Sequence, residues 1–247
     1  MRFTIFSSTQ LLLEQLAKEF LILGQQAKAS HISLSGGSTP ALLFNYLTQS
    51  AYADKINWQK LHFWWGDERC VAADESESNF GQCKKLLLDK VTIPAENIHR
   101  IQGEKDPQQE AIRYAAEIKE HVAEVNGRPQ FDWVILGMGA DGHTASLFPG
   151  QTDYQDTHLT VVAKHPQNGQ LRISKSAYLI ENSKHITYLV LGESKADIID
   201  KINNEPLQSC RYPAGKITAI TGQTQYFLNL ESAKQLIHGQ GQHRSSI

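Results

Sequence analysis

One glycine-rich segment, GMGADGHTASLFPG at 137–150, holds a histidine in a setting that suits acid–base chemistry. Glycines at this density let the backbone approach a ligand closely and aim one or two side chains at it. A neutral imidazole is basic near pH 7, so His143 is a candidate general base. Asp141 can orient the ring or bind a sugar hydroxyl. A structural histidine explains the segment equally well, because the chain contains ten histidines.

Other kinds of catalytic centre find no support in the sequence. Ser146 lies close to His143, but the chain has no GxSxG motif of the kind that presents a nucleophilic serine. It also has no HExxH motif and no cluster of histidines and carboxylates at metal-ligand spacing. We therefore expect water as the nucleophile, no metal and no cofactor.

The hexapeptide SGGSTP follows an apolar run and precedes a helical pattern. Gly36 and Gly37 can adopt positive φ there. Ser38 or Thr39 is then expected to cap the helix, with Pro40 in its first position. Free backbone N–H groups in such a turn bind a phosphate, although a simple strand-to-helix turn explains the peptide equally well. The peptide matches neither the P-loop nor the GxGxxG pattern, so a nucleotide is not indicated.

Charged residues at other expected loops are candidates for binding an anion. Asp67 and Arg69, in GDER, follow a strand too apolar to be exposed throughout, and buried charges need partners or a ligand. A local salt-bridge turn is the simpler interpretation of GDER alone. Arg172 can bind a phosphate through two N–H groups, and Lys195 can act as a point charge. Taken singly, each of these two cations is better explained as a solvated surface charge.

The elements that position these loops alternate along the chain. Buried strands are expected at 31–35, 61–65, 131–136, 185–191 and 216–221. Helices are expected at 9–23, 40–48, 79–89, 107–125, 194–203 and 231–238. This alternation predicts an α/β fold, a Rossmann-like and mostly parallel sheet with helices on both faces. Ligands bind at the carboxyl ends of the strands in such sheets, where the loops described above lie.

Length and composition limit the partners. A chain of 247 residues with 40% hydrophobic residues can bury a full core, and we expect one domain over 1–238 and a polar tail at 239–247. The net charge of -2 arises from mixed charges, which disfavours nucleic acid and membrane partners. Three cysteines without CxxC spacing indicate a reducing cytoplasm. A small-molecule ligand fits this composition best.

Four motifs together resemble one enzyme family. SGGSTP, GDERCVAADESESNF, LLLDKVTIPAENIHRI and VILGMGADGHTASLFPG occur in the order and spacing typical of 6-phosphogluconolactonases, over about residues 30–220. The resemblance implies the fold of glucosamine-6-phosphate deaminase and related sugar-phosphate isomerases. It also implies hydrolysis of 6-phosphoglucono-δ-lactone in the oxidative pentose phosphate pathway, without a metal.

The resemblance also implies roles for particular residues. His143 is the implied catalytic base, and the turn of Gly36, Gly37 and Ser38 is the implied substrate cradle. Asp67 and Arg69 are implied members of the active site, while Arg172 and Lys195 match cations that bind the phosphate. We expect Arg69 to stabilise the developing oxyanion or, alternatively, to hold the phosphate.

Two other functions are weighed against this one. Amino-sugar-phosphate deaminases resemble the chain at SGG and DGH, but they follow DGH with a Phe-Asn-Glu-Pro run that supplies a catalytic carboxylate, where this chain has SLFPG. They also carry Asp-Glu-Tyr where this chain has Asp67, Glu68 and Arg69. A non-catalytic sugar-phosphate sensor would normally need an appended DNA-binding module, and none is visible. The chain departs from the family that it resembles near YFLNLESA, which lacks an acidic residue common in that family. We expect a monomer or a weak homo-oligomer.

Overall fold

A seven-stranded sheet with only parallel pairings forms the centre of the computed structural model, which describes residues 1–204 and 211–237. The strands lie in the order β1-β12-β11-β8-β2-β3-β5. Their bounds are β1 Arg2–Phe6, β2 Ser30–Leu34, β3 Leu61–Trp65, β5 Ile98–His99, β8 Trp133–Gly137, β11 His185–Val190 and β12 Gln223–Asn229. The order reverses between β8 and β2, and such a switch point is where open parallel sheets bind ligands.

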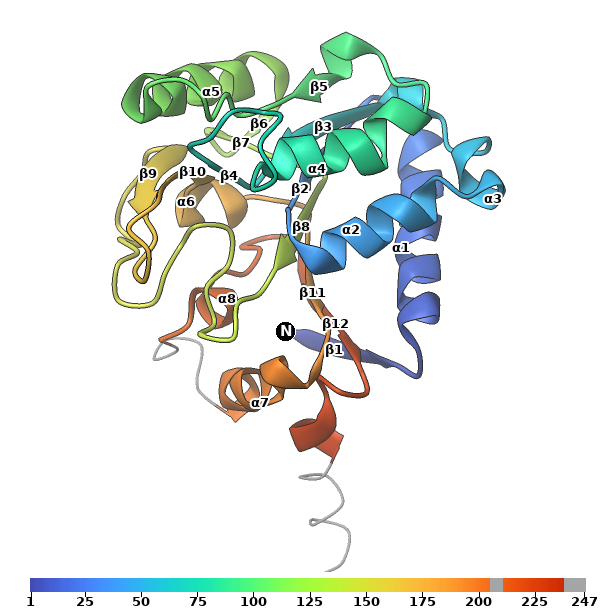
Figure 1. The fold of residues 1–247 in the computed structure, drawn as a ribbon, viewed down its shortest axis with the longest axis vertical. Helices are drawn as coiled ribbons and strands as arrows, with labels where there is room; N and C mark the ends of the chain where they lie inside the picture. The colour runs from blue at the N-terminus through green and yellow to red at the C-terminus, as the bar shows by residue number, and fades with distance from the viewer. Residues whose placement is uncertain (205–210, 238–247) are drawn as a thin grey trace, which may run out of the picture.

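Helices cover both faces of this sheet, with α1 on one side and α6 and α8 on the other (Figure 1). The helices are α1 Thr9–Gly24, α2 Ser38–Leu47, α3 Ser50–Ala53, α4 Asn79–Leu86, α5 Pro107–His121, α6 Ala177–Ile180, α7 Ala196–Asn204 and α8 Pro213–Lys216. Short 3-10 turns lie at Trp58–Lys60, Leu88–Lys90, Ala95–Asn97 and Glu193–Lys195. The α/β fold with helices on both faces is thereby confirmed.

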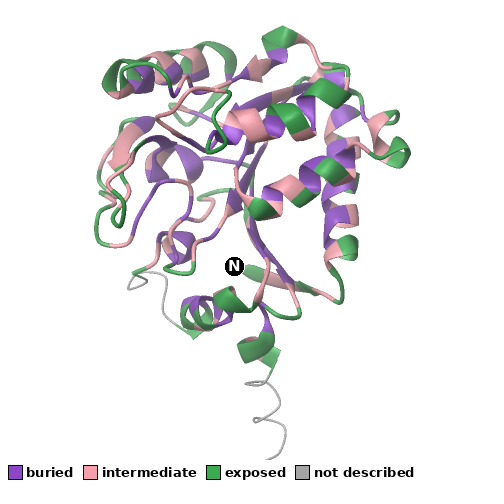
Figure 2. Cartoon of the chain, viewed as in Figure 1, coloured by how far each residue is buried: buried purple, intermediate pink, exposed green. Residues whose placement is uncertain are grey.

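The longest of these helices, α1, shows why the layers hold together. Leu12, Leu16 and Phe20 are spaced four residues apart, lie on one face of the helix and are fully buried. The ring of Phe20 packs against that of Trp133 on β8, with centroids 5.2 Å apart. Burial is concentrated on the central strands and on the helix faces turned toward them (Figure 2). Burial of each such side chain contributes about 1.5–3 kcal/mol.

A smaller antiparallel sheet lies beside the main one and was not expected from the sequence. It joins β4 Asp67–Arg69, β10 Leu171–Lys175 and β9 Thr160–Lys164 in the order β4-β10-β9. Arg172 lies opposite Arg69 in this pairing, and Ser174 lies opposite Asp67. The small sheet thus brings together two charged segments that are about a hundred residues apart. A two-stranded hairpin, β6 Glu124–Val125 and β7 Arg128–Pro129, completes the strands.

Some expected elements are wrong. The strand expected at 216–221 is absent: α8 ends at Lys216, and the strand of this region is β12. The apolar residues that suggested a strand pack from a loop instead, since Ile217 is buried and its carbonyl accepts a hydrogen bond from Tyr188. Strand β1 was missed because it lies at the sheet edge, where none of its five residues is fully buried.

Helix ends also differ from expectation. Helix α5 ends at His121, and the last residues of the expected helix 107–125 belong partly to β6. Residues 234–237 are helical within the expected helix 231–238, and residue 238 lies outside the described residues. The tail expected at 239–247 also lies outside them. No helix in the described parts of the chain has the length and apolarity needed to cross a membrane.

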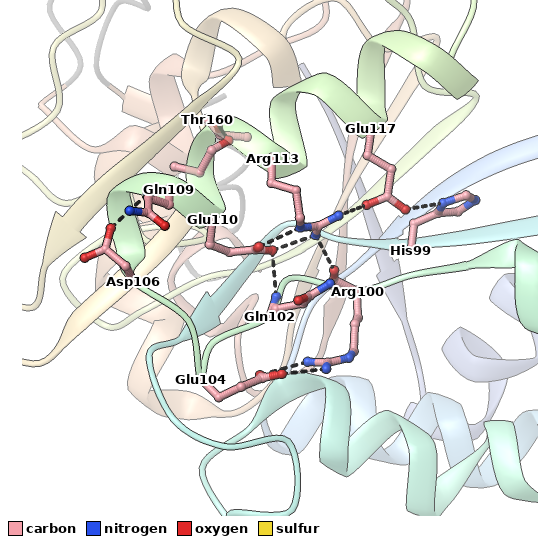
Figure 3. A network of polar contacts seen from close by, with 11 residues as sticks. His99, Arg100, Gln102, Glu104, Asp106, Gln109, Glu110, Arg113, Glu117 and Thr160 are labelled. Atoms are coloured by element: carbon pink, nitrogen blue, oxygen red, sulfur yellow. Dashed lines mark hydrogen bonds and ion pairs between the residues drawn. The ribbon is translucent and has the colours of Figure 1, made fainter.

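Polar contacts fasten α5 to the chain that follows β5 (Figure 3). The Arg113 guanidinium binds both carboxylate oxygens of Glu110, one oxygen of Glu117 and the carbonyl of Arg100. Glu110 is buried and also accepts a hydrogen bond of 2.7 Å from the backbone N–H of Gln102. These contacts therefore fix the helix against the segment that follows β5.

A histidine cluster extends this network across the amino ends of three strands. Nδ1 of His62 and Nε2 of His99 are 3.0 Å apart, and Nδ1 of His99 is 2.8 Å from Glu117 (Figure 3). His31 accepts a hydrogen bond from the indole of Trp64. Burial, assisted by the neighbouring His62, lowers the pKa of His31 to about 4, and burial also lowers the pKa of His62.

Acid should destabilise the protein through this cluster. The unfolded chain binds a proton at His31 below about pH 6.5, whereas the folded protein resists it until about pH 4. The free energy of unfolding should therefore fall as pH drops from about 6.5 to about 4, by on the order of 2 kcal/mol from this group. His31→Asn keeps an acceptor for Trp64 and should flatten this part of the profile. Urea unfolding at several pH values measures it, and an unchanged slope in His31→Asn would contradict the assignment.

Candidate active site

A cavity of about 330 Å³ opens at the carboxyl ends of the central strands. Every residue that the sequence put forward for the site lines it, except Asp141. Those residues are Gly36, Gly37, Ser38, Thr39, Asp67, Arg69, His143, Arg172 and Lys195. The walls also include Asn79, Met138, Ala145, Leu189, Leu191 and Ser194, which the sequence did not indicate as site residues. Loops from distant parts of the chain thus converge where the parallel sheet places them.

The loop after β8 holds His143 in one orientation. Nδ1 of His143 lies 2.6 Å from Oδ1 of Asp141, and the same oxygen accepts the backbone N–H of His143. The carbonyl of His143 accepts the N–H of Gly139, which closes the loop. Because the Asp141 carboxylate accepts a hydrogen bond from the proton on Nδ1, Nε2 of the neutral ring is the basic nitrogen.

Electrostatics within this pair favour an ionised Asp141. Burial opposes ionisation, but the adjacent His143 and its hydrogen bonds outweigh that effect and lower the pKa of Asp141. Asp141 therefore acts on the imidazole from outside the cavity rather than on a ligand. This placement separates the two roles that the sequence left open for Asp141, and it favours orientation of the ring.

The SGGSTP turn differs from the expected cradle. Helix α2 begins at Ser38, its cap is Gly37 with φ of 104°, and no side chain caps it. The N–H of Gly37 is not free, since it donates to Gln82 on α4. The expected capping by Ser38 or Thr39, with Pro40 as the first helical residue, is wrong because the positive φ of Gly37 starts the helix two residues earlier. The backbone N–H groups of Ser38 and Thr39, at the helix N-terminus, have no partner among the described residues.

Two guanidinium groups lie in the cavity wall with donors to spare. Nε of Arg69 and Nε of Arg172 are buried without a hydrogen-bond partner in the described residues. Burial lowers the pKa of Arg172, and the neighbouring Asp67 only partly offsets it. Burial likewise lowers the pKa of Lys195, which Asp141 opposes. Buried cations with unused donors are costly, so this wall is suited to an anionic ligand.

Glu68 is the carboxylate that organises the neighbouring chain. It accepts hydrogen bonds from the backbone N–H groups of Arg69, Asn79 and Phe80 and from the hydroxyl of Ser78. The salt-bridge turn considered for GDER is therefore replaced by a carboxylate bound to the start of α4. Burial raises the pKa of Glu68 against the effect of these donors.

Asn79 is a cavity residue that sequence reasoning missed. The residue before it, Ser78, caps α4 by accepting the N–H of Gly81. The side-chain amide of Asn79 donates to the carbonyl of Asp67 at 2.9 Å. A Cβ on Gly36 would lie 1.8 Å from the amide oxygen of Asn79, so this glycine is required for the close approach.

Ser146 is not placed as a nucleophile. Its side chain is almost fully buried, and its hydroxyl donates to Oδ2 of Asp67 at 2.7 Å rather than to His143. The ring beside His143 is that of Phe148, with centroids 5.1 Å apart. The expectation that water is the nucleophile is thus compatible with the geometry. No three His, Cys, Asp or Glu side chains among the described residues are grouped so that they could hold a metal ion.

Comparison with known proteins identifies the family of this fold. The family model described as glucosamine-6-phosphate isomerases/6-phosphogluconolactonase matches residues 7–226. The chain belongs to this family. It is 52% identical over 236 residues to the 6-phosphogluconolactonases of Aggregatibacter actinomycetemcomitans and Haemophilus influenzae, covering 96% of this chain and the full length of each relative. The family resemblance predicted from the four motifs is confirmed.

Solved structures agree with this family at the level of the fold. The crystal structure of the devB protein superposes with a TM-score of 0.93 at 50% identity, over 95% of this chain and 99% of that one. A monomeric glucosamine-6-phosphate deaminase superposes with a TM-score of 0.82 at 18% identity, over 95% of this chain and the whole of its own. This chain therefore shares its fold with a deaminase, and the fold alone does not assign an activity.

Gly139 should be essential for the Asp141–His143 pair. An added Cβ would lie 2.2 Å from Nδ1 of His143 and 2.4 Å from Oδ1 of Asp141, so Gly139→Ala should separate the two side chains. Imidazole nitrogen NMR should then lose the signature of a hydrogen-bonded Nδ1 proton at His143. Gly66→Ala is the matched control, because its Cβ meets nothing closer than 3.5 Å. Retention of the paired imidazole in folded Gly139→Ala would refute the steric argument.

Proposed function

We propose that this protein hydrolyses 6-phosphoglucono-δ-lactone to 6-phosphogluconate. The observation that carries this proposal is the Asp141–His143 pair beside a cavity whose wall holds unpaired buried guanidinium donors. A lactone with a phosphate needs both a base for water and cations for its anionic end. The relatives that are 52% identical over their full length are named for this activity.

Substrate binding follows from the positions of the cations. The phosphate binds Arg172, Lys195 and the free N–H groups at the start of α2, which fixes the lactone carbonyl near His143. Arg69 lies opposite Arg172 in the small sheet and donates to the oxyanion. Asp67 accepts a hydrogen bond from a sugar hydroxyl. No cofactor or metal takes part in this scheme.

The reaction then proceeds in two proton transfers. Nε2 of His143 takes a proton from water as the water oxygen attacks the carbonyl carbon, and Asp141 stabilises the imidazolium that forms. The tetrahedral intermediate collapses with cleavage of the bond to the ring oxygen. His143 returns its proton to that oxygen, which gives the open 6-phosphogluconate.

The setting of this activity follows from the composition. We propose a cytoplasmic protein that binds the phosphorylated lactone without nucleic acid or membrane, as a monomer or a weak homo-oligomer. Cys70 and Cys83 are both free thiols, which is compatible with a reducing compartment. The third cysteine, Cys210, lies outside the described residues.

Removal of the base should abolish most of the catalysis. His143→Ala should lower kcat by about 10²–10⁴-fold, because it removes general base action. Asp141→Asn should lower kcat less and change its pH profile, since the ring loses the carboxylate that fixes its proton on Nδ1. Hydrolysis of freshly made lactone, corrected for spontaneous opening, measures both. Activity of His143→Ala within a few-fold of wild type would remove His143 from this role.

The same samples test the alternative reaction. Ammonia release from glucosamine 6-phosphate should be undetectable in the wild-type protein, because SLFPG replaces the run that supplies the deaminase glutamate, and Phe148 of this segment packs beside His143. Ammonia release at a rate comparable to lactone hydrolysis would favour the deaminase function instead.

Removal of a phosphate-binding cation should act on binding. Arg172→Ala or Lys195→Ala should raise KM by about 10–100-fold, the loss expected for a hydrogen bond to a charged group, with a smaller change in kcat. Steady-state kinetics on the phosphorylated lactone measure the split between KM and kcat. Equal turnover of unphosphorylated gluconolactone by the wild-type protein would contradict the phosphate site.

A further inference from the structure

Asp67 lies beside two guanidinium groups yet forms no ion pair in the described part of the chain. Asp67, Arg69 and Arg172 all line the cavity, and no nitrogen of either arginine lies within 4.0 Å of a carboxylate oxygen of Asp67. The negative charge of Asp67 nevertheless acts on Arg172 and raises its pKa against the effect of burial. A buried carboxylate so close to unpaired cations would be expected to bind one of them.

Two neutral donors hold this carboxylate instead. The hydroxyl of Ser146 donates to Oδ2 at 2.7 Å, and the amide of Asn79 donates to Oδ1 at 3.3 Å. The bond from Ser146 is the shorter, as expected for a hydroxyl that donates to a charged oxygen. The orientation of the Asp67 carboxylate therefore depends chiefly on Ser146.

Ser146 itself is fixed by its surroundings. Its backbone N–H donates to the hydroxyl of Ser174, the residue opposite Asp67 in the small sheet. Thr144 and Leu147 exchange two backbone hydrogen bonds around it, and Ala145 in this tight turn has a φ of 48°. A non-glycine residue at positive φ persists only where the surrounding contacts impose it. The loop that carries His143 is thus built to bring a hydroxyl to Asp67.

We propose that Ser146 is a positioning residue whose hydrogen bond keeps Asp67 from pairing with the arginines of the cavity, so that the unpartnered guanidinium donors of Arg69 and Arg172 stay available to an anionic ligand. This inference shares one premise with the proposed function, namely that the ligand places an anionic group in this cavity. Ser146 is almost fully buried and is not among the residues that line the cavity.

Loss of the Ser146 hydroxyl changes which group the Asp67 carboxylate binds. Without Ser146, Oδ2 of Asp67 loses its donor while buried, and the unpaired donors close to it are those of Arg69 and Arg172. The carboxylate then pairs with a guanidinium, and an anionic ligand has to displace it. Removal of the negative charge from Asp67 abolishes this competition, which makes the two positions interdependent.

A double-mutant cycle with inorganic phosphate tests the proposal. We compare wild type, Ser146→Ala, Asp67→Asn and the double variant by NMR titration with inorganic phosphate, which needs no turnover. Ser146→Ala should raise the Kd for phosphate about tenfold, the change expected when a charged hydrogen-bond partner is rearranged. Asp67→Asn should bind phosphate at least as tightly as wild type, and the double variant should bind like Asp67→Asn.

Ser183→Ala is the matched control, because Ser183 is also fully buried and its hydroxyl has no hydrogen-bond partner among the described residues. It should leave the Kd for phosphate unchanged.

If Ser146→Ala does not fold, Ser146→Cys replaces it, since a thiol has similar volume and is a weak donor. Ser146→Ala, or Ser146→Cys in its place, should also raise KM for the lactone while kcat changes little.

Two outcomes would overturn the inference. One is a folded Ser146→Ala protein whose Kd for phosphate is within twofold of wild type. The other is a loss of phosphate affinity that persists undiminished in the Asp67→Asn background, which would show that Ser146 acts through the loop and not through the carboxylate. Either result is independent of lactone hydrolysis, so it is distinguishable from a failure of the proposed function.

Discussion

Two guanidinium groups share one cavity wall because β4 and β10 pair with Arg69 opposite Arg172. Like charges held this close on adjacent strands repel each other and are tolerated in a folded protein only where other contacts impose the arrangement. Glu68 imposes it on one side, since it binds the start of α4 to β4. In the proposed function, an anionic ligand supplies the partners that these guanidinium donors lack.

The loop that carries His143 is also held in place by its own contacts. His143 is kept ready by a single carboxylate at 2.6 Å, while the glycine at 139 leaves room for the pair. The loop then passes through Ala145 at positive φ and delivers Ser146 to Asp67. One short segment therefore holds His143, the proposed base, in the cavity and also fixes the Asp67 carboxylate. Such preorganisation lowers the reorganisation needed when the substrate binds.

Local patterns predicted much of this arrangement and failed where contacts are non-local. The rule that ligands bind at the carboxyl ends of parallel strands brought SGGSTP and the DGH loop together correctly, because each loop directly follows its strand. The small sheet escaped prediction, since β4 has only three residues and its partner lies about a hundred residues away. Asn79 was hidden for a similar reason: its role depends on its approach to Gly36, which no local pattern encodes.

The network around α5 links the far edge of the sheet to the cavity. Glu110 accepts a hydrogen bond from the backbone N–H of Gln102 (Figure 3). The next residue, Gly103, packs on the backbone of β4, since a Cβ there would lie 2.2 Å from the carbonyl oxygen of Arg69. The backbone of Arg69 is therefore supported from behind by a segment that α5 fixes through buried charge contacts. Buried charge networks of this kind contribute little net stability, but they favour one arrangement of the segments that they join. In this protein that arrangement maintains the position of a cavity arginine, so the polar edge of the fold serves the site at its carboxyl end.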